Sequence, residues 1–188
     1  MTAGDRPLRP GEAAMTVEQV FDIAPLETGA RVLTAFCSLV AVAGSVLFVF
    51  IGAAGAAPVI LIGFPTFFLA LIAWPMALGP TGYALGAADL AVTRRAARPL
   101  LFPLGSLTAC RPATMPRRTL KRWASGGLFG FWGSFSNKEW GRFKAYANDR
   151  RHGVLLEWPG IKLFVSPEDP EAFCEAVLAR GGRRRPPK

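Results

Sequence analysis

The sequence has no Asp, Glu, Lys, Arg or His from Val32 to Ala88, although charged residues make up 19% of the whole chain. Such a long uncharged stretch is typical of a segment that lies in hydrocarbon. One helical span needs roughly 20 apolar residues at about 1.5 Å each to cross a bilayer core of about 30 Å. The stretch is too long for one span and suits two, with a turn between Gly52 and Pro58 where the large apolar residues stop. The sequence therefore predicts a transmembrane helical hairpin over residues 31–79, with spans at about 31–52 and 58–78.

Residues that carry most enzyme chemistry are also scarce. His152 is the only histidine, and Cys37, Cys110 and Cys174 lie far apart without a CxxC pair. This excludes a multi-His zinc site within one chain, and it favours cysteines that behave as small buried apolar residues in a reducing compartment. Nothing in the spacing of Cys110, His152 and Asp149 suggests an activated nucleophile. The predicted spans hold no charge for an ion pathway, and we expect no catalytic residue, no metal and no cofactor.

Basic residues border the predicted hairpin on one side only. The turn between the spans has none, whereas Arg31 precedes the first span and Arg94, Arg95 and Arg98 follow the second. The positive-inside rule then places both termini in the cytoplasm. A two-span hairpin independently requires its termini to share a side. The sequence thus predicts a multi-pass protein of the cell inner membrane.

The chain before the hairpin, residues 1–30, is predicted to be a cytoplasmic segment that is partly disordered. Thr16–Gln19 has the form of a capping box, so a short helix is one interpretation and an extended segment is the other. The last residues, 181–188, are predicted to be a disordered basic tail.

Residues 82–180 are predicted to form a cytoplasmic domain of short strands closed by one helix. The clearest strands are residues 142–147 and a hairpin of 154–158 and 161–165 around Pro159-Gly160. Arg111–Arg122 is polar and holds two prolines, which predicts a loop. For the final helix, Ser166 is predicted as the N-cap and Pro167 as the first residue. The predicted fold class is α+β: a two-helix transmembrane hairpin followed by an antiparallel β-barrel or sandwich that a C-terminal helix caps.

Four segments carry a resemblance to a known family: Gly126–Phe135, Trp140–Ala147, Val154–Leu156 and Val165–Phe173. In this order they resemble bacterial pleckstrin-homology-like (PH-like) domains, in particular members anchored in a membrane. The resemblance covers about Gly82 to Arg180. It implies a PH-like barrel without known catalysis, and it transfers no binding residue to this chain.

Two groups of residues are candidates for surface contacts. The first is basic, and we expect it either to be solvated or to contact anionic lipid or a partner: Arg117, Arg118, Lys121 and Arg122. The second is aromatic, and its rings either pack inside the domain or dip into the membrane interface: Phe129, Phe131, Trp132 and Trp140. The glycines among these aromatics favour positive φ or close backbone approach, because the lysine of a phosphate-binding loop is missing.

Three functions are compatible with these observations. The first is a non-enzymatic inner-membrane protein that presents a PH-like domain for protein or membrane-surface binding or scaffolding. The second is a self-associating structural membrane component, since Ser38, Gly44 and Ser45 would let another helix approach closely. The third and least favoured is an enzyme that acts on a membrane substrate. The expected partners are the lipid bilayer and another protein or a second copy, whereas membrane tethering disfavours nucleic acid.

Overall fold

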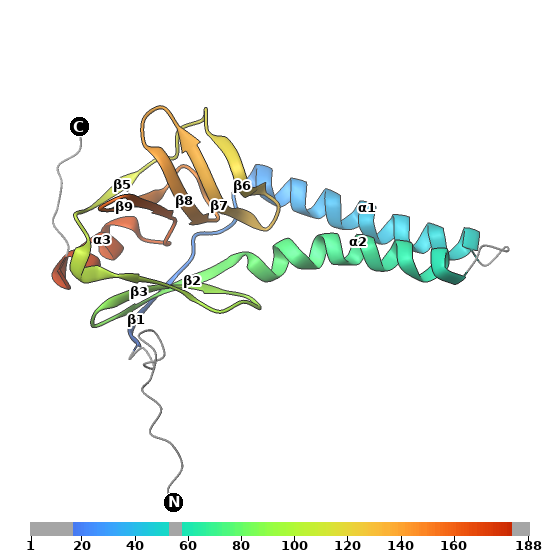
Figure 1. The fold of residues 1–188 in the computed structure, drawn as a ribbon, viewed down its shortest axis with the longest axis horizontal. Coiled ribbons are helices and arrows are strands. Elements are labelled where there is room, and N and C mark those ends of the chain that lie inside the picture. The colour runs from blue at the N-terminus through green and yellow to red at the C-terminus, as the bar shows by residue number, and fades with distance from the viewer. Residues whose placement is uncertain (1–16, 53–57, 182–188) are drawn as a thin grey trace, which may run out of the picture.

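A computed structural model describes residues 17–52 and 58–181 of the chain. Within these residues three α-helices and two β-sheets form, in the arrangement of Figure 1. The disordered segments predicted at the two ends of the chain largely lie outside the described residues, as does the turn predicted between the spans. The elements are β1 (Val17–Asp22), α1 (Thr28–Gly52), α2 (Pro58–Leu78), β2 (Pro80–Gly86), β3 (Asp89–Arg94), β4 (Leu100–Pro103), the short 3₁₀ helix η1 (Leu104–Ser106), β5 (Ala109–Ala113), β6 (Leu120–Gly127), β7 (Gly130–Asn137), β8 (Gly141–Ala147), β9 (Gly153–Trp158), β10 (Ile161–Val165) and α3 (Pro170–Ala179).

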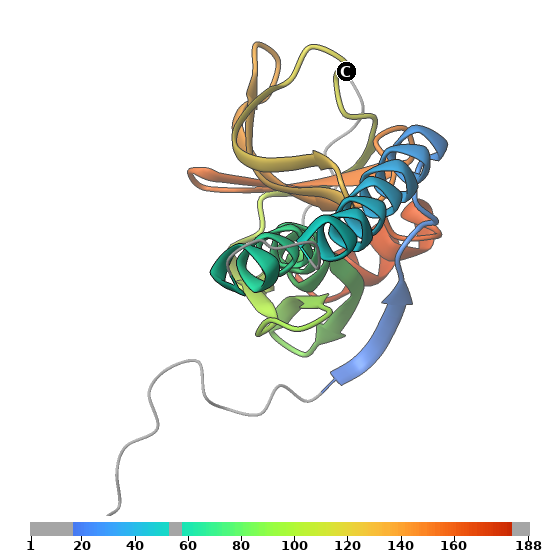
Figure 2. The ribbon, with the colours of Figure 1, turned by 90° about the vertical axis from the view of Figure 1, so that its right-hand side faces the viewer.

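Helices α1 and α2 lie side by side, run in opposite directions and project from one side of the strands (Figures 1 and 2). One described segment, Thr28–Phe50, is a helix long and apolar enough to cross a membrane. Its 23 residues extend about 34 Å at about 1.5 Å each, slightly more than a bilayer core of about 30 Å. The corresponding apolar stretch of α2, Pro65–Leu78, is shorter.

The first sheet is antiparallel with the strand order β1-β2-β3-β4. Strand β1 precedes the helices in sequence, yet it pairs with β2, which follows them, and Phe21 lies opposite Tyr83. Of the two interpretations of the N-terminal segment, the structure has the extended one. Its Phe21 ring meets Phe173 of α3 edge-on, with 5.1 Å between the centroids, so a tertiary contact accompanies the strand.

The second sheet has the order β5-β9-β10-β8-β7-β6. The predicted hairpin of β9 and β10 is confirmed, and Gly160 adopts the positive φ that its turn requires (78°). The prediction of a purely antiparallel arrangement is wrong, because β10 inserts between β9 and β8 and pairs with β8 in parallel. Of the two predicted forms, barrel or sandwich, the barrel is wrong, because the sheets are not closed. The sheets remain separate, since β6 ends the second sheet and pairs with β7 alone.

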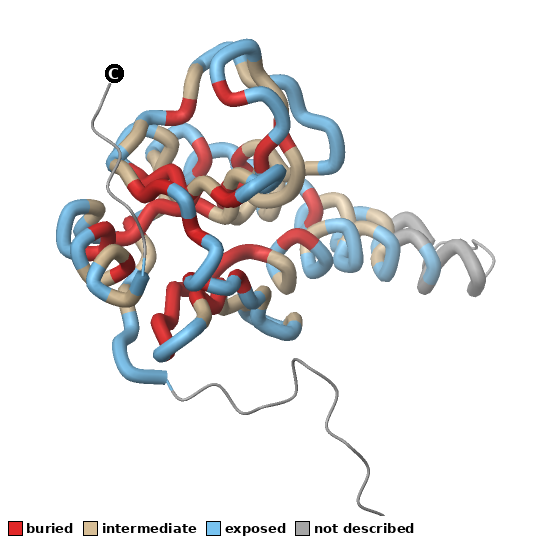
Figure 3. Tube along the Cα trace, turned by 60° about the vertical axis from the view of Figure 1, so that its left-hand side comes forward, coloured by how far each residue is buried: buried red, intermediate tan, exposed pale blue. Residues whose placement is uncertain are grey.

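Two apolar clusters lie on opposite faces of the second sheet. Along β10, Leu163 and Val165 enter the cluster between the sheets, whereas Phe164 enters the cluster on the other face. This alternation follows from the two-residue period of a strand. Helix α3 completes the first cluster with Phe173, Cys174 and Val177. Buried residues therefore concentrate in the strands and α3, and Figure 3 shows few of them along the projecting helices.

The predicted start of the final helix is wrong by three residues. The sequence has two possible pairs of N-cap and proline, Ser166-Pro167 and Asp169-Pro170, and the helix uses the second. Asp169 is the N-cap, since its Oδ1 accepts hydrogen bonds from the backbone N–H groups of Glu171 (3.1 Å) and Ala172 (3.0 Å), and Pro170 begins the helix. Ser166 is instead buried, and its Oγ accepts a hydrogen bond from the Asn148 N–H at 2.8 Å. Both Ser-Pro and Asp-Pro fit a helix start, and the tertiary hydrogen bond at Ser166 decides between them.

The loop predicted over Arg111–Arg122 is wrong at both ends. Strand β5 extends through Arg111 to Ala113, because it pairs with β9, and β6 begins at Leu120, because it pairs with β7. Pro112 is tolerated because β5 is the terminal strand of its sheet. Only the middle of the segment connects strands, and this changes the setting of the basic candidates.

Candidate functional site

The turn between β6 and β7 is held against the bases of both projecting helices. Thr34 of α1 donates a hydrogen bond from Oγ1 to the Gly127 carbonyl oxygen (3.2 Å) and accepts one from the Phe129 N–H (3.1 Å). At the end of α2, a Cβ placed on Gly79 would lie 2.9 Å from the Phe129 carbonyl oxygen. Only glycine permits this approach, so the turn is fitted tightly to both helices.

The positive φ angles at this turn match the glycine interpretation of the sequence. Gly127 (122°), Gly130 (105°) and Gly133 (114°) all adopt a backbone conformation that L side chains rarely take. At Gly133 a Cβ would also lie 2.2 Å from the Trp123 carbonyl oxygen of β6. The glycines therefore let β6 and β7 approach and turn beside the helices.

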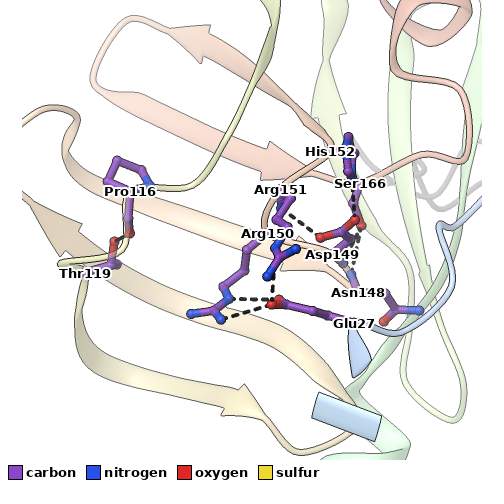
Figure 4. A network of polar contacts seen from close by, with 9 residues as sticks. All are labelled: Glu27, Pro116, Thr119, Asn148, Asp149, Arg150, Arg151, His152 and Ser166. Atoms are coloured by element: carbon purple, nitrogen blue, oxygen red, sulfur yellow. Dashed lines mark hydrogen bonds and ion pairs between the residues drawn. The ribbon is translucent and has the colours of Figure 1, made fainter. Parts of the chain in front are cut away.

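A second polar link joins the segment before α1 to the loop between β8 and β9 (Figure 4). The Glu27 carboxylate accepts two hydrogen bonds from Arg150, from Nε at 3.0 Å and from Nη2 at 3.2 Å. The Glu27 N–H donates to the Asn148 carbonyl oxygen (3.0 Å), and Asn148 Nδ2 donates to the Ala24 carbonyl oxygen (3.1 Å). The Arg150 guanidinium also lies over the Phe131 ring, 4.7 Å from its centroid.

The basic candidates are all exposed, and the structure divides them between two settings. Arg117 and Arg118 precede β6 and line a cavity of about 900 Å³ with Lys138 of the turn between β7 and β8. Lys121 and Arg122 lie on β6 itself, at a β-bulge between Lys121 and Trp123. Two of the four cations thus lie on the terminal strand of the second sheet, and the other two lie in the loop directly before it.

The aromatic candidates divide between the core and the surface. Phe131 and Trp140 are buried in the second apolar cluster, where Trp140 meets Phe143 edge-on at 5.1 Å between centroids. For these two rings the packing interpretation holds. Phe129 and Trp132 are half-buried, and Phe129 lies in the turn against the helix bases.

Trp123 was not among the predicted contact residues, yet it is the most exposed large apolar side chain of the described residues, with an exposed fraction of 89%. It lies between the predicted polar loop and the glycine-rich block that follows. The available signal was composition, because a tryptophan directly after two cations, Lys121 and Arg122, is typical of a membrane interface.

The potentially reactive groups elsewhere are better explained by packing and turns. Cys110 and Cys174, which the sequence separates widely, are buried against each other. The hydrogen bond with Cys174 and burial raise the pKa of the Cys110 thiol, so it stays protonated and is a poor nucleophile. Asp149 and His152 form an exposed pair at a turn (3.0 Å). Residues 17–52 and 58–181 contain no group of three or more His, Cys, Asp or Glu that could hold a metal ion.

Comparison with known families identifies the strand domain. A family model described as "Bacterial PH domain" matches residues 81–181, more than half of the chain. The chain belongs to the bacterial PH domain family. No curated protein and no solved structure matches the sequence.

The match confirms the PH-like resemblance and covers β2 to α3, so the PH domain begins directly after α2. Strand β1 lies before the matched residues, although it pairs with the PH domain's own β2. PH-like domains are generally non-catalytic binding modules. In this chain such a module is bonded through Thr34 to a helix that is apolar enough to cross a membrane, and through Glu27 to the residue directly before that helix.

Proposed function

We propose that this chain is an inner-membrane protein in which both α1 and α2 cross the bilayer and hold the PH domain on the cytoplasmic side. There the PH domain serves as a non-enzymatic binding or scaffolding module for another protein or for the membrane surface. Both termini then lie in the cytoplasm. The observation that carries this proposal is an apolar helix with its side chains exposed, joined firmly to a domain of a binding family.

The exposed apolar side chains of α1 support the lipid environment. Phe36 is 63% exposed, and Leu39 and Phe50 are similarly uncovered. Each large apolar side chain left in water forgoes roughly 1.5–3 kcal/mol of burial free energy. Lipid tails remove this cost, because they are as apolar as the side chains themselves.

The arrangement of basic residues supports the orientation. Arg94 ends β3, and the loop after it, which carries Arg95 and Arg98, is bonded to the end of α2. There the Arg95 N–H donates to the Gly79 carbonyl oxygen (3.3 Å) and the Ala96 N–H donates to the Ala77 carbonyl oxygen (3.1 Å). These cations therefore lie at the helix base, where positive charge favours the cytoplasmic leaflet.

A self-associating membrane component is the second candidate. A Cβ placed on Gly44 of α1 would meet no atom within 4 Å, so α2 does not fill this small-residue position. A helix of a second copy could approach there. Cross-linking in native membranes distinguishes the candidates, because a ladder of self-products favours this second function.

A matched pair of lysine substitutions tests the membrane anchor. Leu39→Lys places a charge on the exposed face of α1, where it costs roughly 2.5–3.5 kcal/mol at the centre of a span. We expect this variant to be depleted from carbonate-washed membranes, whereas Ile161→Lys on the exposed β9–β10 turn should remain in them like the unaltered chain. Release of the unaltered chain by carbonate, or reporter fusions that place the carboxyl terminus outside, would refute the proposal.

A further inference from the structure

Strand β6 presents an apolar and basic edge that the PH domain itself leaves uncovered. Trp123 and Leu120 are both strongly exposed, and Lys121 and Arg122 lie between them. Ala124 packs against the second apolar cluster, so β6 is anchored on its inner side. The exposed Trp123 and Leu120 are therefore surface features of a well-packed strand.

The position of β6 relative to α1 limits what can lie opposite this edge. The carboxyl end of β6 is bonded to Thr34 through the Gly127 carbonyl oxygen. Thr34 lies about 9 Å along the helix axis from Thr28, at about 1.5 Å per residue. The end of β6 therefore stands level with the first turns of the candidate span, and Figure 1 shows β6 on the side of the domain from which the helices project.

A strand from another chain would be the ordinary partner for a terminal strand, but β6 is poorly suited to accept one. The β-bulge between Lys121 and Trp123 interrupts its regular register. Lys121 folds back across Gly126, into the space that a Cβ would occupy. Bulges and charged side chains are the means by which proteins prevent strand addition at a sheet edge.

The same features suit a lipid interface. Tryptophan favours the headgroup region, where its apolar ring and its polar N–H are both accommodated. Lysine and arginine beside it can pair with lipid phosphates while their alkyl chains cover apolar surface. The occupant that fits both the chemistry and the location is the anionic leaflet that α1 enters.

We infer that β6 is a second membrane contact, in which Trp123 and Leu120 insert among the headgroups and Lys121 and Arg122 bind the phosphates of anionic lipids. The inference rests on the proposed function, because it needs α1 in the bilayer. It adds that the PH domain is held against the membrane in one orientation, with β6 toward the bilayer and β10, three strands away in the second sheet, farther from it.

Site-directed spin labelling of the full chain in nanodiscs tests this contact. Trp123→Cys and Leu120→Cys report on β6, Phe36→Cys on the span, and Ile161→Cys on the exposed β9–β10 turn, all in a Cys37→Ser background. Cys110 and Cys174 are buried, and the background protein alone checks that they remain unlabelled. Collision with oxygen, which partitions into lipid, is compared with collision with a water-soluble nickel complex.

We expect the ratio of oxygen to nickel collision to be highest at position 36, intermediate at 120 and 123, and lowest at 161. In discs that contain phosphatidylglycerol, Lys121→Ala with Arg122→Ala should lower the ratio at 123 toward that at 161. In discs of phosphatidylcholine alone, the same pair should have little effect, because no anionic phosphate excess is present.

The outcomes separate the two proposals. Position 36 in lipid with positions 120 and 123 as accessible to nickel as 161 would overturn the β6 contact alone. Position 36 accessible to nickel would overturn the membrane anchor. A label at 123 shielded from both oxygen and nickel would also overturn the lipid contact, because it would assign β6 to a protein partner.

Discussion

The projecting helices and the PH domain are both rich in apolar residues, but they place them in opposite ways. In the PH domain Phe164, Phe173 and Leu163 are completely buried. In α1, Phe36 and Leu39 face outward, and only 6% of the most apolar part of the helix is buried inside the structure. Figure 3 shows this division along the chain. Apolar residues are therefore common to both regions, and what distinguishes the regions is whether these residues are buried inside the structure or exposed.

The two regions also satisfy their polar groups differently. In α1 the Ser45 hydroxyl donates to the Ala41 carbonyl oxygen one turn earlier (2.7 Å). In the PH domain the Tyr83 hydroxyl donates to the Tyr146 carbonyl oxygen (2.6 Å) and accepts from the Ser166 N–H (2.9 Å), so it joins β2 to β8 and to the end of β10. The Ser45 hydroxyl is thus satisfied within its own helix, and the Tyr83 hydroxyl depends on partners distant in sequence, as Thr34 does at the base of α1.

The largest expected effect comes from one phenylalanine in each region. Phe173→Ala should destabilise the PH domain by about 3–5 kcal/mol, because it leaves a cavity beside Phe21 and Tyr83. Phe36→Ala, on the exposed side of α1, should leave the domain's stability nearly unchanged. Denaturant unfolding of the full chain in detergent micelles, followed by tryptophan fluorescence, measures both.

Equal destabilisation by the two substitutions would break the comparison, since it would mean that Phe36 packs against protein. Leu101→Ala serves as a further control, because Leu101 is exposed within the domain itself. Its effect should resemble that of Phe36→Ala.

The same contrast explains what the sequence could predict. Local signals were sufficient for both helices, for the hairpin of β9 and β10, and for the family. They did not predict features that depend on contacts between residues distant in sequence. Ser166 accepts a hydrogen bond from the Asn148 N–H, and Asp169 is the N-cap of the helix in its place. The parallel pairing of β10 with β8 likewise joins strands that are not consecutive in the chain.

The candidate site was predicted in part for the same reason. The basic residues can be seen in the sequence, but burial of Phe131 and Trp140 and exposure of Trp123 follow from how β6 and β7 pair and which face they turn inward. A strand places successive side chains on opposite faces, and a bulge shifts this alternation by one residue. No local pattern reveals that shift.

The next largest loss of stability is expected when the buried hydroxyl of Tyr83 is removed. Tyr83→Phe should cost about 1–3 kcal/mol, because the buried Ser166 N–H and the Tyr146 carbonyl oxygen both lose their hydrogen bonds to it. Ser45→Ala in α1 should change the domain's stability little, since the hydroxyl it removes bonds within its own helix. The same unfolding assay compares them, and a larger effect of Ser45→Ala would contradict the contrast.

The two tyrosines of the chain also make the stability of the PH domain dependent on pH. Burial raises the pKa of Tyr83 and of Tyr146, although the hydrogen bonds with Ser166 and the charge of Arg94 respectively oppose the shift. Below a pH of about 10 both phenols are protonated in the folded and the unfolded chain, so they contribute no pH dependence. Above it the unfolded chain releases protons first, and stability should fall as pH rises. Tyrosinate absorbance should therefore appear together with unfolding, and its appearance in the folded protein near pH 10 would contradict this.

The smallest loss of stability is expected at the joint between the two regions, the ion pair of Glu27 with Arg150. Glu27→Gln removes the charge that holds Arg150, and because the Arg150 side chain is 42% exposed the cost should be at most about 1 kcal/mol. Glu18→Gln is the matched control, since its partner Arg180 lies at a comparable 3.3 Å but the pair connects β1 with α3 inside the domain.

Spin labels at positions 36 and 161 measure the distance between helix and domain. We expect Glu27→Gln to broaden that distance distribution and Glu18→Gln to leave it unchanged. If Glu27→Gln leaves it equally narrow, the hydrogen bonds of Thr34 to the β6–β7 turn hold the joint, and Thr34→Val should then broaden it instead.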